Sequence, residues 1–429
     1  MKTKLYIASV LAAAASCASA TTTVVENSVA LSYNAGTGDM AIAYELSGDE
    51  PCVVTIGIET NAAGDVWKAV NGPDICGDAN RMIWTAGAKK AYWMPNRDVN
   101  DVFPAEGIRA VVKAWATNAP PDYVAIDIVS ETSVAMVSTN NVRYYESAAA
   151  VPGGVSAEKY KTDTLLMRKI PAALVKWKMG SPTGESGRGS DETQHWVTLS
   201  NDYYIGVYEF TKGQYYKTKD TYSGAGYPHG SGQNGLQFGS PLTAVEYVNM
   251  NDLRGKPTTA AANPDGFFGW PRSRHQVTSG SLIQAIRNRT GFEVDLPTEA
   301  QWEYACRAGT GTCIYTGASA YANAPGNFNG GSVVAVGRYT PNSWGLYDMY
   351  GNVGEFVLDR YAAYTADDAF DPVGADGDGE FTGDNACIMR GASFYQAGSG
   401  RRSASREPTK QSGAKTKGFR LVCPAVAVR

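Results

Sequence analysis

LPTEAQWEYACRAG, at residues 296–309, decides the fold of the C-terminal part of this chain, because it contains a helix with its own start and stop signals. Thr298 followed by Gln301 matches a capping box, in which the hydroxyl and the amide satisfy exposed backbone groups reciprocally. Gly309 is placed to end the helix. Three residues should share one buried helical face: Trp302, Ala305 and Cys306.

The same helix carries two acids, Glu299 and Glu303. Acids near a helix start are favoured by the helix dipole and are usually solvated. We therefore expect both carboxylates to face solvent, without a catalytic role. A second capping box, Thr243 with Glu246, predicts another helix that starts at that position.

Further sequence motifs follow along the chain. They are NSWGLYDMYGNVGEF at 342–356, RGASF at 390–394, RRSASR at 401–406 and GFRLV at 418–422. In this order, and together with 296–309, they resemble the formylglycine-generating enzyme (sulfatase-modifying factor) family, whose domain is a variant of the C-type lectin fold. The resemblance covers roughly residues 165–425 and implies an α+β fold there, irregular and C-type-lectin-like.

The family's enzymes oxidise a substrate cysteine with copper, which two cysteines hold a few residues after the RGGS-like strand. In this chain the equivalent stretch, Tyr395 to Gly400, contains no cysteine. Cu(I) requires soft thiolate ligands, which oxygen and imidazole groups do not replace. The residues therefore argue against copper, and no catalytic residue is assigned.

Two classes of function remain. We expect a non-catalytic, extracellular ligand-binding protein that reuses the fold, as C-type lectins and the variable proteins of diversity-generating retroelements do. The alternative is a formylglycine-generating oxidase acting on a sulfatase cysteine, or a related family oxidoreductase. That alternative requires a distant cysteine brought close by folding. The wide spacing of His195, His229 and His275 argues against relatives that bind non-haem iron through a histidine triad.

The candidate ligand site is the loop after RGASF, which would lie over the former active-site groove. Its ligand would be an extracellular glycan or peptide, bound by aromatic stacking and hydrogen bonds. The predicted contact residues are Phe394, Tyr395, Gln396, Ser399 and Trp344. Three other aromatic residues are candidates for stacking, with core packing as the alternative for all of them: Tyr203, Tyr204 and Tyr350.

A candidate metal site lies in GLYDMYGNVGEF. Asp348 and Glu355 are hard oxygen donors, and the glycines between them let the backbone turn and expose carbonyls, which is the mixed shell that calcium prefers. The resemblance implies a structural calcium site formed by Asp348, Gly351, Val353 and Glu355, the middle two through their carbonyls. Alternatively, the two acids cap turns or pair with nearby arginines.

The C-terminal stretch is basic. Its cationic residues are Arg401, Arg402, Arg406, Lys410, Lys415, Lys417 and Arg420. The resemblance implies that the arginines there are mostly buried and pair with carboxylates. This argues against a dedicated anion site.

The N-terminus, MKTKLYIASVLAAAASCASA at 1–20, has the lysines, apolar run and small-residue end of a secretory signal peptide. We expect cleavage after Ala20; lipidation of Cys17 is the alternative. The mature chain would then be secreted, or periplasmic and cell-surface. No later apolar run is long enough to span a bilayer. The formal net charge of −4 gives no sign of nucleic acid as a partner.

Residues 21–150 show short alternating runs between turn-rich pieces, which predicts an all-β sandwich of the fibronectin or immunoglobulin kind. The runs are VALSYNA, MAIAYEL, CVVTIGIET, IRAVVKAWA, YVAIDIV and VAMVST. Residues 151–165 are a predicted linker, since Pro152-Gly153-Gly154 interrupts regular structure. Residues 166–429 are the predicted formylglycine-generating-enzyme-like domain.

Six cysteines remain after the predicted cleavage, an even number that favours disulfides in an exported protein. The natural pairs are Cys52 with Cys76, Cys306 with Cys313, and Cys387 with Cys423. The resemblance implies that Cys306 lacks its usual partner, because Ser403 stands at that position. A free, buried Cys306 is the alternative.

Overall fold

The computed structural model describes residues 22–425 apart from 62–65, 96–106, 129–140, 220–239, 256–276, 278–279, 329, 375–386, 397 and 411. The chain divides into two compact units. The first consists of residues 1–126, 138–157 and 425–429, and the second of residues 127–137 and 158–424. The predicted signal peptide lies outside the described residues.

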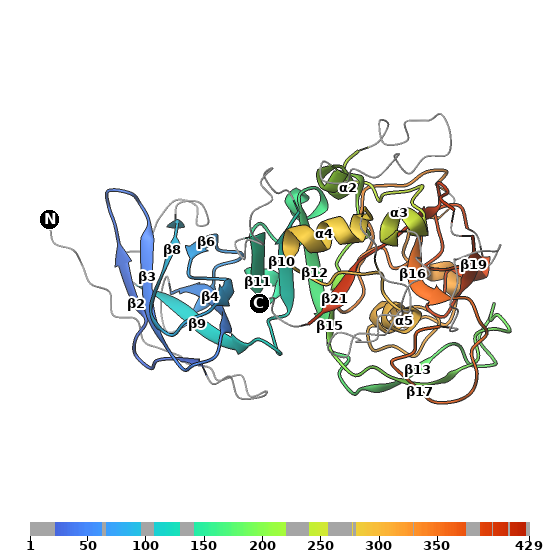
Figure 1. Ribbon diagram of the computed structural model, residues 1–429, viewed down its shortest axis with the longest axis horizontal. Helices are drawn as coiled ribbons and strands as arrows, with labels where there is room; N and C mark the ends of the chain where they lie inside the picture. Colours follow the sequence, from blue (N-terminus) through green and yellow to red (C-terminus); the bar gives the residue numbers. More distant parts are fainter. Residues whose placement is uncertain are drawn as a thin grey trace. The chain divides into compact units, whose positions relative to one another are not determined.

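The first unit contains two antiparallel sheets (Figure 1). One consists of β1 (Thr23–Val24), β2 (Ala30–Tyr33), β3 (Met40–Ser47), β8 (Gly87–Trp93) and β6 (Ile75–Gly77). The other consists of β5 (Lys68–Ala69), β4 (Cys52–Thr60), β7 (Arg81–Ile83) and β9 (Ile108–Ala116). β10 (Tyr123–Asp127) pairs with β11 (Val142–Tyr145), which precedes a short 3-10 helix, η2 (Ala148–Ala150).

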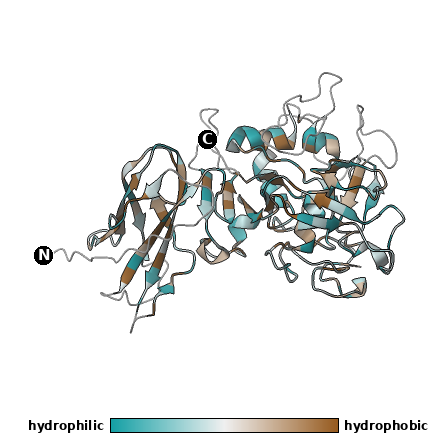
Figure 2. Cartoon of the chain, turned by 90° about the horizontal axis from the view of Figure 1, so that it is seen from below, coloured by the Kyte–Doolittle hydropathy of each residue, from teal (hydrophilic) through white to brown (hydrophobic). Residues whose placement is uncertain are grey.

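Both sheets of this unit contribute to one hydrophobic cluster. Leu31 and Ile42 enter it from the first sheet, and Val54, Ile56 and Val112 from the second. In β3 the buried residues alternate with more exposed ones. Figure 2 shows hydrophobic and hydrophilic residues next to one another along the strands. The two sheets and their shared core agree with the alternating pattern of the sequence. The fibronectin- or immunoglobulin-like class stays a prediction.

The longest predicted strands of this unit are confirmed, because β4 and β9 occupy CVVTIGIET and IRAVVKAWA. VAMVST lies outside the described residues. The sequence prediction missed β8, whose first half is rich in glycine, alanine and lysine. β8 forms because it pairs along its length with β3, and not because of its own composition.

The second unit is β-rich with few helices and has an α+β composition. One group of paired strands consists of β12 (Thr164–Ile170), β15 (Tyr203–Gly206) and β21 (Val422–Pro424). A three-stranded sheet consists of β13 (Lys176–Met179), β14 (His195–Thr198) and β17 (Ala369–Phe370). A four-stranded sheet consists of β19 (Glu407–Thr409), β18 (Cys387–Arg390), β16 (Gly354–Arg360) and β20 (Lys417–Gly418). Its helices are α2 (Lys212–Lys219), α3 (Met250–Arg254), α4 (Leu282–Thr290), α5 (Glu299–Arg307) and the 3-10 turns η3 (Glu158–Lys161), η5 (Tyr321–Asn323) and η6 (Gly398–Gly400).

Helix α5 is the centre of the second core. The Thr298 side chain accepts from the Gln301 N–H, and the Gln301 side chain binds back, so the predicted capping box is confirmed. The helix ends at a left-handed Ala308. Figure 1 places α5 between β16 and the β13–β14–β17 sheet, and it contacts both β13 and β16. Its predicted face is buried: Trp302, Ala305 and Cys306.

The second capping-box prediction is wrong. Thr243 bonds to the Ser240 carbonyl through both its N–H and its hydroxyl, and no helix begins there. Glu246 instead pairs with Lys212 at 3.0 Å. The nearest helix, α3, begins later, behind the N-cap Asn249. The local sequence is compatible with a helix cap, but the Glu246 carboxylate is engaged by Lys212 from a distant part of the chain.

The predicted disulfides do not form, and all six cysteines from Cys52 to Cys423 are free. Cys52 faces the core from β4, whereas Cys76 is exposed on a strand of the other sheet. Cys387 and Cys423 lie in two different sheets as well. Cys306 is buried against the hydroxyls of Tyr350 and Ser403, which confirms the alternative of a free, buried thiol.

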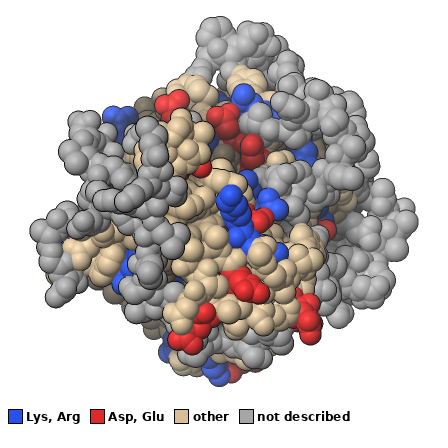
Figure 3. Space-filling view, turned by 90° about the vertical axis from the view of Figure 1, so that its left-hand side faces the viewer, with Lys and Arg blue, Asp and Glu red and all other residues tan. Residues whose placement is uncertain are grey.

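The segment predicted as a linker is structured over much of its length, since it includes η3 and the start of β12. Among the described residues, no helix is long and apolar enough to cross a membrane. On the face shown in Figure 3, basic and acidic side chains are interspersed among uncharged residues, in keeping with the small net charge of −4.

Candidate functional site

The loop that follows β18 is held by its backbone. Gly391 and Ala392 both have positive φ angles, 87° and 62°, so the chain turns sharply out of the strand. The Phe394 N–H donates to the Asn352 carbonyl at 2.8 Å, and the Phe394 ring is 1% exposed. Phe394, predicted as a ligand contact, is therefore an anchor of the loop and contributes almost no surface.

Gln396 closes the loop through its side chain. Its Oε1 accepts from the Ser393 N–H at 3.1 Å, and its Nε2 donates to Glu407 on β19. Burial raises the pKa of Glu407, whereas the bond from Gln396 lowers it. Gln396 thus joins the loop to the neighbouring strand, which is a positioning role.

Tyr395 is the residue that this arrangement presents to solvent. Its side chain is 68% exposed, and the Lys415 ammonium lies 4.8 Å from the centre of its ring. Ser399 is also exposed, in η6, and its carbonyl accepts from Arg402 Nε at 2.9 Å. An exposed ring beside a cation is suited to contact a polar ligand.

The remaining predicted aromatic residues do not join this loop. Trp344 is half-buried, and its ring lies 5.2 Å from that of Tyr304 on α5. Tyr203, Tyr204 and Tyr350 are at most 1% exposed, so they belong to the core.

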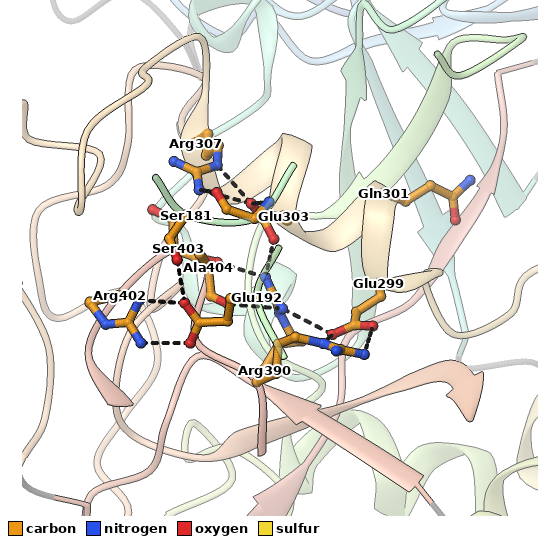
Figure 4. Close-up of polar contacts among 12 residues, drawn as sticks. Ser181, Glu192, Glu299, Gln301, Glu303, Arg307, Arg390, Arg402, Ser403 and Ala404 are labelled. Atoms are coloured by element: carbon orange, nitrogen blue, oxygen red, sulfur yellow. Dashed lines mark hydrogen bonds and ion pairs between the residues drawn. The ribbon is translucent and has the colours of Figure 1, made fainter. Parts of the chain in front are cut away.

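Beneath the loop lies a buried network of arginines and carboxylates (Figure 4). Arg390 lies between the two acids of α5, 3.0 Å from Glu299 and 2.6 Å from Glu303, whereas Gln301 points away. Arg406 also binds Glu299, at 2.6 Å. The expectation that Glu299 and Glu303 are solvated is wrong, because β18 and the RRSASR segment present arginines to this side of α5.

The prediction that the C-terminal arginines are buried and paired is confirmed. Arg402 binds Glu192 at 2.6 Å, in the same network, and Arg420 binds Glu355 at 2.6 Å. Although burial alone would raise the pKa of Glu303, Arg307 and Arg390 hold that pKa below its ordinary value. These two arginines therefore keep the Glu303 carboxylate charged inside the protein.

Burial makes three thiols of this unit weak acids. Burial raises the pKa of Cys306 and of Cys313 to about 11, and that of Cys387 to about 12. A thiol with such a pKa is protonated at neutral pH, whereas the thiolate is the form that ligates a metal. The Ser403 hydroxyl lies 2.6 Å from that of Tyr350, beside Cys306.

The predicted calcium residues occupy a buried turn and the start of β16, into which the turn leads. Asp348 accepts from the Gly337 N–H at 2.6 Å through one oxygen, and its other oxygen is buried without a hydrogen-bond partner among the described residues. Gly351 has a φ of 77° and lies so close to Asn327 that a Cβ would be 2.6 Å from the Asn327 carbonyl oxygen. The Val353 N–H donates to Glu209 at 3.0 Å.

Glu355 is engaged differently from Asp348. Both of its oxygens accept from Arg420, at 2.6 Å each, and one also accepts from Trp302 Nε1 at 2.8 Å. This is the arginine pairing that the sequence left open as the alternative. Among the described residues, no group of three His, Cys, Asp or Glu side chains is placed to hold a metal ion. Backbone carbonyls would have to complete any calcium site here.

The charges around this turn do not balance. Glu209, Asp348 and Glu355 are all buried, and Arg420 is the guanidinium buried among them. Burial, followed by the neighbouring carboxylates, raises the pKa of Glu209 well above its ordinary range. Burial also raises the pKa of Asp348 to about 6. The unpaired oxygen of Asp348 and the excess of buried acid both fit a bound cation, whereas the Glu355–Arg420 pair does not supply a free ligand.

Sequence reasoning missed Glu209, Glu407 and Lys415 as parts of these sites. Glu209 had a signal, since it is a single acid in the otherwise uncharged run YIGVYEF, and such a residue needs a buried partner. Glu407 and Lys415 had none, because they reach the loop from separate segments of the chain.

The fold and these sites define a sulfatase-modifying-factor type of domain. The family model described as "Sulfatase-modifying factor enzyme 1-like domain" matches residues 151–425, and the chain belongs to this family.

Individual relatives match shorter segments. The formylglycine-generating enzyme of Mus musculus is 33% identical over 120 residues, which are 24% of this chain and 32% of that protein. The formylglycine-generating enzyme of Mycobacterium tuberculosis is 35% identical over 106 residues, 21% of this chain and 35% of that protein. The matches thus span about a third of each relative. The solved structure of PvdO from Pseudomonas aeruginosa aligns with a TM-score of 0.45 at 22% identity, over 61% of this chain and 94% of that one.

Proposed function

We propose that this chain is a non-catalytic, extracellular binding protein whose ligand, a glycan or a peptide, contacts the loop after β18. The observation that carries the proposal is the exposure of Tyr395, at 68%, on a loop that Phe394 and Gln396 hold in place. Water solvates an exposed aromatic ring poorly, so a ligand that covers the ring is favoured. Because the loop is held in place, less conformational entropy is lost when the ligand binds. Lys415 supplies a cation beside the ring, and Ser399 supplies an exposed hydroxyl on the same loop.

The chemistry of the cysteines supports a non-catalytic role. Residues 391–402 contain no cysteine, and the nearby thiols, Cys306 and Cys313, are buried and protonated at neutral pH. The alternative is an oxidase that acts on a sulfatase cysteine. It predicts copper uptake and an aldehyde product, by mass spectrometry, from a peptide with a CxPxR sequence. We expect neither, and finding both would replace the proposal.

Tyr395→Ala tests the binding loop. Glycan and peptide arrays identify a ligand for the parent protein, and the variant should then lose at least about tenfold in affinity, or 1.4 kcal/mol. Trp84→Ala removes an aromatic residue of the first unit that is 43% exposed, and serves as the matched control. The proposal fails if Tyr395→Ala binds as well as the parent, or if the control loses as much.

A structural calcium ion at Asp348 is a second part of the proposal. Asp348 would supply its unpaired carboxylate oxygen, and Gly351 and Val353 would supply their backbone carbonyl oxygens. Glu355 would be a ligand only while its carboxylate also stays paired with Arg420. A bound divalent cation would offset the excess of buried negative charge at this turn. Its removal should therefore lower stability without changing the ligand preference of the loop.

A further inference from the structure

The three-stranded sheet of β13, β14 and β17 has one buried and one open face. Trp177, Met179 and Val197 point into the second core. The alternate positions point outward: Lys176, Lys178, Trp196, Thr198 and Phe370. We call these five residues the outer face. The register places Trp196 opposite Lys178, and Thr198 opposite both Lys176 and Phe370, so the five form one continuous surface.

The outer face is unusually apolar for a solvent-exposed surface. Phe370 is 63% exposed and Trp196 is 40% exposed. Leu174 and Val175, which lead into β13, are 70% and 41% exposed. In the described part of the second unit, Tyr395 is the one other large hydrophobic residue with comparable exposure. Exposed apolar groups gathered in one place mark interaction surfaces more often than scattered ones do.

Of the two lysines on the outer face, Lys178 contributes the positive charge that is not balanced in the described part of the chain, because Lys176 pairs with an acid. The ammonium groups of Lys178 and Lys176 lie 5.1 Å and 5.3 Å from the centre of the Trp196 ring. Lys176 also pairs with Asp368 at 2.7 Å, where both side chains are more than half exposed. Within the described residues, Lys178 has no carboxylate partner. A cation held beside an exposed indole can bind an acidic group while the ring contacts an apolar surface.

We propose that the outer face binds an acidic polysaccharide, with sugar rings stacked on Trp196 and Phe370 and a carboxylate or sulfate group paired with Lys178. The two aromatic side chains are diagonal neighbours on one face of the paired strands β14 and β17, because Phe370 lies opposite Thr198, two residues from Trp196. One oligosaccharide can therefore contact both. A sheet is flat on this scale, and saccharides stack on flat aromatic surfaces through their apolar ring faces. The charge complementarity of Lys178 favours an acidic polysaccharide over a neutral one.

This site is independent of the loop after β18, because the two share no residue or element. Removal of Tyr395 should therefore leave the outer face active. The other candidate for this surface is a second copy of the chain. Self-association is an outcome of the test and would overturn the assignment to a polysaccharide.

The full chain is measured against heparin, chondroitin sulfate and polygalacturonate, with dextran as the neutral control. We expect binding to at least one acidic polymer, none to dextran, and weaker binding as salt rises. Trp196→Ala and Phe370→Ala should each reduce affinity by about tenfold. Lys178→Gln should reduce both the affinity and its dependence on salt. Trp84→Ala is the matched control for removal of an exposed aromatic residue.

Folding is checked by the melting temperature, which Trp196→Ala should hardly change because the residue lies on the open face. Trp196→Phe provides a second variant that keeps an aromatic ring and should retain most of the affinity. The proposal is overturned if no acidic polymer binds, if dextran binds equally, or if Trp196→Ala and Trp84→Ala behave alike. Concentration-dependent dimers that Phe370→Ala abolishes would instead assign the face to self-association.

Discussion

Two buried clusters of charge in the second unit differ in their balance. Beneath the loop after β18, three arginines from β18 and RRSASR meet three glutamates, and each ion pair is short. At the turn before β16, three buried carboxylates surround Arg420, with the half-buried Lys161 nearby. A balanced cluster is complete within the chain, whereas an unbalanced one takes up protons or binds a cation. The first is therefore structural, and the second is where we look for an ion.

The largest effect should come from breaking the balanced cluster. Arg390→Met leaves Glu299 and Glu303 buried with fewer partners, so we expect a loss of about 3–5 kcal/mol in the free energy of unfolding, measured with urea. Lys217→Met breaks an exposed ion pair of 3.6 Å with Asp163 and should cost at most about 1 kcal/mol. Equal losses in the two variants would show that the network does not stabilise the fold.

Calcium should act on the unbalanced cluster. An ion that binds only the folded state stabilises it by about 2.7 kcal/mol at a hundredfold excess over its dissociation constant. Chelator should accordingly lower the melting temperature, and Asp348→Asn should abolish the difference. Asp359→Asn, at a buried acid outside this turn, should leave the calcium response unchanged. An identical melting curve in chelator and in calcium would remove the metal from the proposal.

In the absence of calcium, the Asp348 carboxylate should make the free energy of unfolding depend on pH. The pKa of Asp348 is raised from 3.8 to about 6 in the folded protein, mainly by burial. The folded state therefore binds the proton more tightly than the unfolded state does, so the free energy of unfolding falls as pH rises from about 4 to about 6. Chemical denaturation across this range, in chelator, should show that fall, and Asp348→Asn should reduce it. A stability that rises over the window in the parent but not in the variant would contradict the assignment.

The smallest effects concern the loop itself. Gln396→Ala removes the bonds to Ser393 and Glu407, so it should cost about 1 kcal/mol. Tyr395→Ala removes an exposed ring and should change stability by less than about 0.5 kcal/mol. Thermal melts of the two variants thus separate the residue that positions the loop from the one that contacts a ligand. If Tyr395→Ala is the more destabilising of the two, the ring is part of the packing.

Local patterns of the sequence were sufficient wherever neighbours along the chain decide the structure. The capping box at Thr298, the buried face of α5 and strands β4 and β9 follow from side-chain spacing and short-range hydrogen bonds. The family was also evident from motif order, and the missing cysteines of the 395–400 stretch were visible directly. None of these conclusions requires knowledge of which distant segments meet.

Only the tertiary structure decided the partners of the charged and sulfur-containing side chains. Glu299 and Glu303 resemble solvated first-turn acids until β18 brings Arg390 against them. The cysteines form an even set, yet Cys52 lies in another sheet than Cys76, Cys387 lies in another sheet than Cys423, and all six thiols are free. Glu355 resembles a metal ligand until Arg420, from the distant segment between β20 and β21, pairs with it. Electrostatic and covalent partners depend on distance in space, which spacing along the chain does not determine.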